Sequence, residues 1–302
     1  MSGSSRERSP ARRPGVAARA ARALAAVLRG EPGRIFPEQI HSLHRGSRSI
    51  GRVSGLRSKA LMTRLVAGEA FRAVPNQPTA DTAVPFRVKT MDGRAVWLRL
   101  RSHDRSALEF LYQGHHLPPA ELTGRVERIA VFGANIGLLL GDLAARYPGA
   151  HLLGVEPDQD NAALARRNLA HLGERCTLLE APVWHRDESL TLSWGHDAWG
   201  LILADLPHQN GGGAATLQVD AIDAGRLLGE FSNQAPIDYL LVNIETAWYE
   251  MLKHGEWTRN VRCIKIEIQD HYDEAVPLLE ALGYRAQLQR LGWGAFAIGI
   301  RR

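Results

Sequence analysis

The sequence predicts an α/β protein built on a doubly wound, mostly parallel sheet. Between residues 129 and 157, a hydrophobic run, a glycine-rich turn, an amphipathic segment and a second hydrophobic run follow one another. Strand and helix patterns keep alternating towards the C-terminus, which is typical of parallel sheets covered by helices on both faces. These two observations predict the fold class.

The first strand and helix form the most regular part of the chain. Residues 129–132 are an apolar run, and residues 133–137 form the turn Gly-Ala-Asn-Ile-Gly. Apolar residues then recur with the spacing of one helix face, which predicts a single stripe packed against a sheet. The stripe consists of Ile136, Leu139, Leu140, Leu143, Ala144 and Tyr147. Gly149 is expected to end this helix.

Shorter patterns predict the later elements. A strand over residues 152–155 precedes a helix that either Asp158 or Asp160 caps. Further strands are expected over residues 176–179, 239–244, 264–268, 287–291 and 295–300, with a helix over 273–282. Residues 205–210, which follow the third core strand, are expected to form a mobile loop.

Three regions are expected along the chain: a basic extension over residues 1–58, a lead-in segment over 59–124 and the main domain over 125–302. The extension carries twelve arginines and three glutamates, and its first residues are too polar to offset chain entropy, so partial disorder is expected. A helix over residues 58–66, a hairpin around Asp92-Gly93 and a helix over 106–112 are expected to follow.

Composition favours a cytoplasmic protein without a membrane span. The longest N-terminal apolar run, residues 24–28, falls far short of the ~20 residues that cross a bilayer. The Arg-rich and Ala-rich start also suits a transit peptide, although Pro10, Pro14 and Pro32 interrupt any long amphipathic helix there. The two cysteines, Cys176 and Cys263, suit a reducing compartment and indicate no disulfide framework or metal site.

The glycine turn and a following acid outline a nucleoside pocket. Gly133 and Gly137 allow the backbone to approach a ligand where the next helix begins, and Glu156, about 20 residues on, can accept hydrogen bonds from both hydroxyls of a ribose. A dinucleotide enzyme more usually shows Gly-x-Gly-x-x-Gly, so the turn favours S-adenosylmethionine (SAM) over NAD. A tight turn without a ligand and a surface acid are the plainer alternatives.

From residue 87 to the C-terminus the chain resembles the FkbM-type SAM-dependent methyltransferases. Their first motif typically reads Asp-x-Gly-Ala-Asn-x-Gly, which residues 133–137 match while Val131 replaces the aspartate. Glu156-Pro157, Asn168 and Ile266-Glu267 match later positions of the family. In the family's Lys-Ile-Asp-Val-Glu-Gly-Ala-Glu signature, aligned with residues 241–248, only Glu245 and Ala247 are retained.

The resemblance implies a Rossmann-like sheet of the class I methyltransferase type with an antiparallel C-terminal edge, and SAM as the cofactor. Related enzymes hold adenine after the third strand, where Glu180-Ala181-Pro182 lies. The expected cofactor-binding residues are Gly133, Ala134, Asn135, Gly137, Glu156, Pro157, Ala181 and Asn243. In the family a hairpin and a helix also help to cover the cleft. The rim groups this suggests are Arg99, Arg101, His103, Tyr112, His115 and His116.

Methyl transfer to a hydroxyl requires alignment of two reactants and removal of one proton. Glu245 is the leading candidate for the base, and Glu267 and His271 are the alternatives. Asn243 can position a ligand but cannot act as a base. The resemblance implies O-methylation of a small-molecule or sugar-containing acceptor, whose identity the sequence leaves open.

Two rival hypotheses follow from the departures and from the basic extension. Val131 and Asn243 stand at usual acidic positions, which favours a catalytically weak or inactive binding or scaffold protein as the alternative. The basic extension could attract nucleic acid, but it lacks interleaved aromatic residues for base stacking, so a nucleic-acid partner is not expected. No pair of histidines has convincing metal-binding geometry, and the oligomeric state is open.

Overall fold

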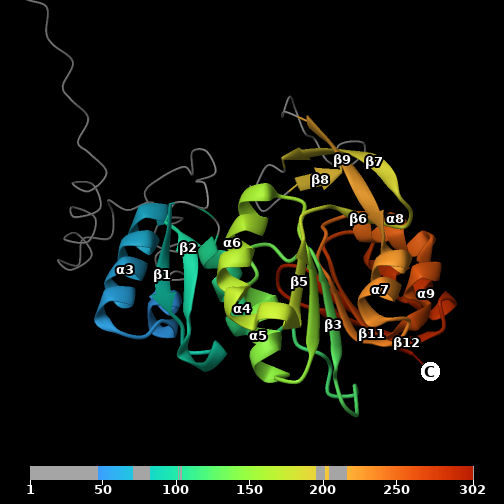
Figure 1. The fold of residues 1–302 in the computed structure, drawn as a ribbon, viewed down its shortest axis with the longest axis horizontal. Coiled ribbons are helices and arrows are strands. Elements are labelled where there is room, and N and C mark those ends of the chain that lie inside the picture. Colours follow the sequence, from blue (N-terminus) through green and yellow to red (C-terminus); the bar gives the residue numbers. More distant parts are fainter. Residues whose placement is uncertain are drawn as a thin grey trace, which may run out of the picture. The chain divides into compact units, whose positions relative to one another are not determined.

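The computed structural model of the protein describes residues 47–70, 82–100, 102, 104–194, 201–203 and 216–301 (Figure 1). The chain divides into two compact units, Met1–Asn76 and Gln77–Arg302. In the first unit, residues 47–52 are helical and helix α3 spans Leu56–Ala70, which confirms the predicted helix. Most of the basic extension lies outside the described residues, and the three-part division of the chain stays a prediction.

A seven-stranded sheet forms the centre of the second unit. Its strand order is β12-β13-β11-β10-β3-β4-β5. The five parallel strands are β3 (Arg128–Phe132), β4 (His151–Val155), β5 (Cys176–Leu179), β10 (Ile237–Val242) and β11 (Val261–Ile268). Strands β12 (Tyr284–Arg290) and β13 (Ala295–Arg301) complete an antiparallel edge. The predicted mostly parallel sheet and its antiparallel edge are therefore confirmed.

The order of strands reverses beside β3, and this reversal locates the site. Strand β3 pairs with β4 on one side and with β10 on the other, so the chain leaves β3 in one direction and later returns to its opposite edge. Open α/β sheets bind ligands beyond the carboxyl ends of their strands at such a point. A ligand is therefore expected at the carboxyl ends of β3, β4 and β10.

Helices cover both faces of the sheet (Figure 1). Helices α4 (Asp104–Gln113), α5 (Leu138–Arg146) and α6 (Gln159–Leu169) lie on one side, and α7 (Ala224–Ser232), α8 (Ala247–Lys253) and α9 (Tyr272–Ala281) lie on the other. The Asp158 carboxylate caps α6 by accepting a hydrogen bond from the Asn161 backbone, so Asp158 rather than Asp160 begins that helix. The 3₁₀ helices η4 (Ala170–Arg175) and η5 (Gly255–Asn260) complete two of the connections.

A hairpin precedes the sheet, as predicted. Strands β1 (Ala83–Arg87) and β2 (Ala95–Arg99) pair in antiparallel fashion around the short 3₁₀ helix η3 (Met91–Gly93). The buried amide of Asn168 attaches the hairpin to the main sheet. Its Oδ1 accepts from the Trp97 backbone at 2.7 Å, and its Nδ2 donates to the Ile136 backbone at 2.8 Å. One side chain thus joins β2, α6 and the glycine turn.

A second, four-stranded sheet lies between β5 and β10 in the chain, and the sequence did not predict it. Its strands are β6 (Val183–Trp184), β7 (Glu188–Trp194), β8 (Leu201–Leu203) and β9 (Thr216–Asp223), in the order β6-β9-β7-β8. Strand β7 pairs with both β8 and β9 in antiparallel fashion. The predicted loop over residues 205–210 lies outside the described residues.

The core on the α7–α9 face consists of side chains from alternate positions of the central strands and from these helices. Phe132, Leu240 and Ile264 of the sheet belong to the same buried cluster as Leu228 of α7 and Trp248 of α8. Both cysteines are free thiols, one on β5 and one on β11. Within the described part of the chain, no helix combines the length and apolar character needed to cross a membrane.

Candidate active site

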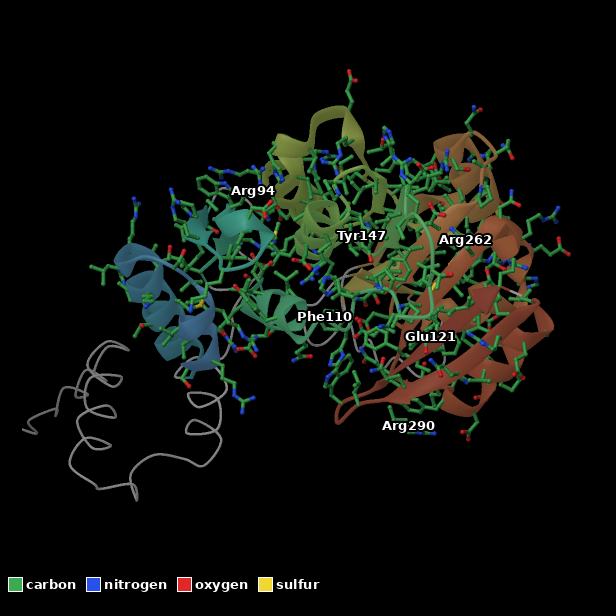
Figure 2. All side chains as sticks on the ribbon, turned by 90° about the horizontal axis from the view of Figure 1, so that it is seen from below. Arg94, Phe110, Glu121, Tyr147, Arg262 and Arg290 are labelled. Carbon is green, nitrogen blue, oxygen red and sulfur yellow. The ribbon has the colours of Figure 1, made fainter. Side chains whose placement is uncertain are left out.

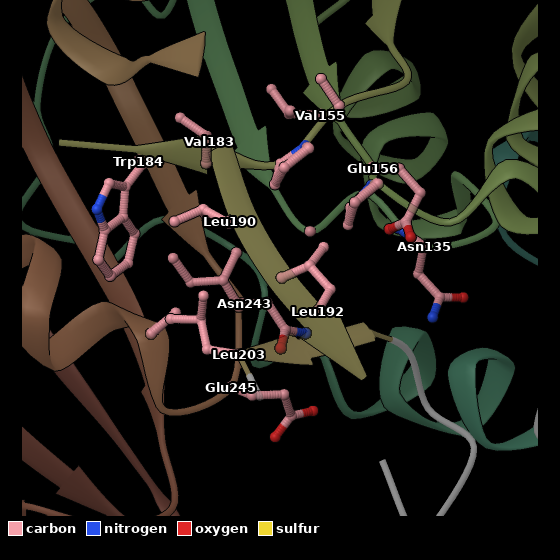
Figure 3. Close-up of a pocket in the computed structure, with 16 residues that line it drawn as sticks. Asn135, Val155, Glu156, Val183, Trp184, Leu190, Leu192, Leu203, Asn243 and Glu245 are labelled. Carbon is pink, nitrogen blue, oxygen red and sulfur yellow. The ribbon is translucent and has the colours of Figure 1, made fainter. Parts of the chain in front are cut away.

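A cavity opens at the carboxyl ends of β3, β4 and β10, with about 810 Å³ of empty space that is partly open to solvent (Figure 3). The turn after β3 and the loop after β4 contribute Gly133, Asn135, Glu156 and Pro157. The loop after β10 contributes Asn243, Ile244, Glu245 and Ala247, and the segment after β5 contributes Ala181 and Pro182. The cavity therefore lies at the point where the strand order reverses.

Gly133 brings two strand ends into close backbone contact. It has a φ of 80°, and its N–H donates to the Val155 carbonyl at 2.9 Å. A Cβ added to Gly133 would lie 1.8 Å from the carbonyl oxygen of Asn243, a distance no real side chain tolerates. Only glycine therefore allows the end of β3 to pack against the end of β10, and this contact shapes the floor of the cavity.

The Glu156 carboxylate lies beside the glycine turn. Its Oε2 accepts from the Asn135 backbone N–H at 2.7 Å, and its Oε1 accepts from the Asp158 backbone N–H at 3.1 Å. Figure 3 shows Glu156 next to Asn135 on one side of the cavity. The Asn161 side chain also bonds this carboxylate, and a carboxylate, with about four lone-pair sites, can still accept from a ligand. The acid and the turn, 21 positions apart in the sequence, therefore form one site.

Burial raises the pKa of Glu156 to about 7, although the two backbone N–H groups favour the ionised form. Only 5% of this residue is exposed. Near neutral pH the side chain therefore exchanges between its protonated and ionised forms. A ligand that donates hydrogen bonds to the carboxylate would favour ionisation.

A buried network supports the loop that carries Glu156. Arg99 forms an ion pair with Asp104 at 2.7 Å and donates to Asn161 Oδ1 at 2.6 Å. Asn161 in turn donates its backbone N–H to the Asp158 cap of α6. Arg99 was a suggested cleft-rim group, but it is buried in this network and fixes the helix that follows the acid.

None of the described rim groups lines the cavity. His116 is fully buried, and its Nε2 pairs with Asp142 Oδ2 at 2.9 Å. Thr90 also donates to Asp142, so these residues tie the hairpin region to α5. Tyr112 does not line the cavity, and its hydroxyl accepts a hydrogen bond from the Lys89 backbone N–H. Arg101 and His103 lie outside the described residues.

Six of the eight expected cofactor-binding residues line the cavity: Gly133, Asn135, Glu156, Pro157, Ala181 and Asn243. Ala134 and Gly137 do not. Ala134 is buried within the turn, and Gly137, with a φ of 81°, begins helix α5 and packs against Leu169. These two residues therefore shape the turn from behind.

The three candidate bases occupy different environments. Glu245 lines the cavity with a φ of 50°. Glu267, on β11, lies outside the lining, and burial together with the neighbouring Glu245 raises its pKa to about 8. His271 begins α9, and its ring stacks on Tyr249 with 3.9 Å between centroids. Among the three, only Glu245 faces the cavity.

Left-handed backbone conformations recur at this edge of the sheet. Asn135, Glu245 and His271 have φ values of 48°, 50° and 49°, and they follow β3, β10 and β11 respectively. Such conformations cost about 1 to 3 kcal/mol for residues other than glycine and concentrate at functional sites. Their occurrence after three neighbouring strands supports a functional role for this edge.

The second sheet supplies a cavity wall that sequence reasoning missed. Val183 and Trp184 of β6, Leu190 and Leu192 of β7, and Leu203 of β8 line the side opposite Glu156 (Figure 3). The alternation of Leu190 and Leu192 with polar residues is a strand signal that could have been recognised. The wall makes this side of the cavity apolar.

Among the residues that the structure describes, no group of three or more His, Cys, Asp or Glu side chains is arranged to hold a metal ion. The polar side chains of the cavity lining include two acids, Glu156 and Glu245, and two amides, Asn135 and Asn243. This set can accept hydrogen bonds from hydroxyl groups and can take up a proton.

No protein-family model and no curated protein matches the sequence. Among solved structures, the chain is similar to precorrin-6y C5,15-methyltransferase from Geobacter metallireducens, with 12% identity, 64% of this chain and 88% of that chain covered, and a TM-score of 0.39. It is also similar to an O-methyltransferase family protein from Burkholderia thailandensis, with 12% identity, 87% of this chain and 68% of that chain covered, and a TM-score of 0.41. A third similar structure is TrmK from M. capricolum in complex with S-adenosyl-homocysteine, with 12% identity, 63% of this chain and 66% of that chain covered, and a TM-score of 0.36.

Proposed function

We propose that the protein binds SAM in the cavity at Glu156 and transfers its methyl group to a hydroxyl of a small-molecule or sugar-containing acceptor, as a divergent FkbM-type enzyme. The observation that carries the proposal is the buried Glu156 carboxylate, 2.7 Å from the backbone N–H of Asn135 in the glycine turn. A carboxylate at this place accepts the two hydroxyls of a ribose, while the turn leaves room for the rest of the nucleoside.

The other lining residues suit the parts of such a cofactor. Ala181 and Pro182 follow β5, where the edge of an adenine would lie, and Trp184 and Leu192 supply an apolar wall. Val131, fully buried in β3, provides no carboxylate for the methionine ammonium at this position of the turn, and the side-chain oxygen of Asn243 in the cavity lining is one group that can accept from it. When bound, SAM supplies an activated methyl group, and the protein supplies orientation and proton removal.

Glu245 is the residue that we assign to accept the proton of the acceptor hydroxyl. It lines the cavity, whereas Glu267 does not. Because the pKa of Glu267 is raised to about 8, that side chain is mostly protonated at neutral pH and is poorly suited to accept another proton. A protonated Glu267 does not repel the ionised form of the neighbouring Glu245. His271 stays an alternative only for an acceptor that reaches beyond the cavity lining.

Isothermal titration calorimetry with SAM tests the proposal. We expect low-micromolar or tighter binding by the full chain, and binding weakened about ten- to a hundredfold by Glu156→Ala, because charge-assisted hydrogen bonds contribute about 1.5 to 3 kcal/mol. Glu230→Ala is the matched control. This exposed acid of α7 pairs with Arg226 and does not line the cavity, so its removal should leave SAM affinity unchanged.

The outcomes separate the hypotheses. No heat of binding at millimolar SAM would exclude the proposed cofactor. Tight binding of SAM without turnover of any hydroxyl acceptor, together with activity gained in Val131→Asp, would favour the catalytically weak binding protein instead.

A further inference from the structure

A second cavity, with about 880 Å³ of empty space partly open to solvent, lies over the β11–β13–β12 part of the sheet. It shares no lining residue with the cavity at Glu156. The segment after α4 forms one side through His115, Leu117 and Pro118, and the sheet forms the other through Lys265, Gln287 and Ile298. Figure 2 shows Glu121, which also lines this cavity, over the C-terminal strands of the sheet.

Lys265 is an unusual residue for the interior of this sheet. It occupies a central position of β11, paired with Leu241 of β10 and Ile298 of β13, and it is only 4% exposed. Its Nζ donates to the backbone carbonyl of Leu117 at 3.1 Å. Within the described part of the chain, no carboxylate forms a salt bridge with it, although Glu121 lines the same cavity. A buried ammonium without a carboxylate partner is costly unless something else compensates its charge.

The protein compensates this charge only partly. The Phe296 ring lies 5.0 Å from Lys265 Nζ, which provides a cation–π contact. The His115 ring, which lines the same cavity, lies 6.0 Å from this phenylalanine. The ammonium has three N–H donors, of which the Leu117 carbonyl accepts from one. Since Lys265 lines the cavity, a ligand there can accept from the others.

We propose that this cavity binds an organic monocarboxylate, whose carboxylate pairs with Lys265 Nζ and whose apolar body packs against Leu117, Pro118 and Ile298. The side-chain amide of Gln287 lies at the same wall and can donate to the second carboxylate oxygen. The apolar walls favour an organic acid over a small inorganic anion, which would leave them facing water. This site is separate from the proposed cofactor site, and the proposal of a carboxylate ligand does not depend on SAM binding.

Proton uptake provides a second signature of binding. Burial lowers the pKa of Lys265 to about 8. The other titratable groups at the site are His115, whose pKa is lowered by burial and by the Lys265 charge, Glu121, and Cys263 on the same strand. Because a bound carboxylate stabilises the charged ammonium, its presence should raise the pKa of Lys265, and the affinity for the anion should fall as the pH rises past 8.

Nuclear magnetic resonance of the full chain labelled with [¹³C]lysine tests the proposal, since the sequence contains only four lysines: Lys59, Lys89, Lys253 and Lys265. Benzoate is the probe, benzamide is its neutral counterpart, and inorganic phosphate is the anion without an apolar body. We expect benzoate to shift the Lys265 signal and raise its pKa, with the other three lysines unchanged. Lys265→Met should weaken benzoate binding about ten- to a hundredfold, as expected for loss of a charge-assisted bond.

Lys253→Met is the control, because Lys253 is half-exposed and paired with Glu250. It should leave benzoate binding unchanged, and Glu156→Ala should do the same, which separates this site from the proposed function. Equal binding of benzamide, or of phosphate, would overturn the proposal, as would an unshifted Lys265 signal at tens of millimolar benzoate. If Lys265→Met did not fold, the pKa of Lys265 in the natural chain, with and without benzoate, would still decide between these results.

Discussion

Replacing Gly133 by alanine should disrupt the candidate active site and destabilise the fold far more than an ordinary glycine substitution. Two effects add. The left-handed φ of 80° costs an L-residue about 1 to 2 kcal/mol, and the new Cβ would lie 1.8 Å from the Asn243 carbonyl oxygen. To restore a normal contact, the ends of β3 and β10 would have to separate by more than an ångström. We therefore expect Gly133→Ala to lower the free energy of unfolding by roughly 4 kcal/mol or more.

Gly93→Ala is the matched control for the backbone effect. Gly93 has a φ of 71°, close to that of Gly133, and an added Cβ would meet nothing within 4 Å. Its substitution should therefore cost only about 1 to 2 kcal/mol. Urea unfolding of both variants, followed by circular dichroism, measures the difference. Equal losses of stability in the two variants would refute the inference that backbone contact between β3 and β10 requires glycine at position 133.

Three acids with shifted pKa values, Glu156, Glu267 and Asp142, make ligand affinity or stability depend on pH. The affinity for SAM should be constant well above pH 7 and fall about tenfold per pH unit below it, because protonated Glu156 loses its capacity to accept both ribose hydroxyls. Glu156→Gln should bind SAM weakly at every pH. Calorimetry from pH 5.5 to 8.5 checks both expectations. Glu267 has a pKa of about 8 in the folded state against 4.5 normally, so its contribution to stability is present below pH 4.5 and is lost as the pH rises through 8. At pH 9 the free energy of unfolding of Glu267→Gln should therefore exceed that of the natural chain by as much as roughly 4 kcal/mol. A urea midpoint of the variant equal to or below that of the natural chain would count against this prediction. The Asp142 carboxylate accepts hydrogen bonds from His116, Arg146 and Thr90, which lower its pKa to about 2. Its contribution of about 2 kcal/mol to the free energy of unfolding should persist above pH 4 and disappear as the pH falls through 2. In thermal melts, Asp142→Asn should therefore be less stable than the natural chain at pH 7 but not at pH 2.

The parts of the fold with strong local signals could be predicted from the sequence. The turn from Gly133 to Gly137 and the helix stripe after it depend on neighbouring residues only, and the structure contains both. Glu156 could be linked to the turn because a strand, a turn and a helix bring two strand ends together in a fixed way. The predicted strands and helices of the core likewise occur, with their ends shifted by a few residues.

The rest depends on contacts between distant residues, which local patterns do not reveal. The wall formed by Trp184 and Leu192 exists because β7 pairs with β8 and β9, and short strands separated by long connections give weak signals. The proximity of Glu245 and Glu267, which raises the pKa of Glu267, arises from the parallel pairing of β10 and β11. Lys265 was missed because a single charged residue within an apolar strand carries no sign of what faces it.

A crystal structure of the full chain with S-adenosylhomocysteine, grown above pH 7.5, would reveal where the nucleoside binds. We predict the ribose of the bound nucleoside at Glu156, with both of its hydroxyls within 3.2 Å of the carboxylate oxygens and the glycine turn beside it. A nucleoside bound elsewhere, or one in this cavity whose hydroxyls avoid Glu156, would contradict the account.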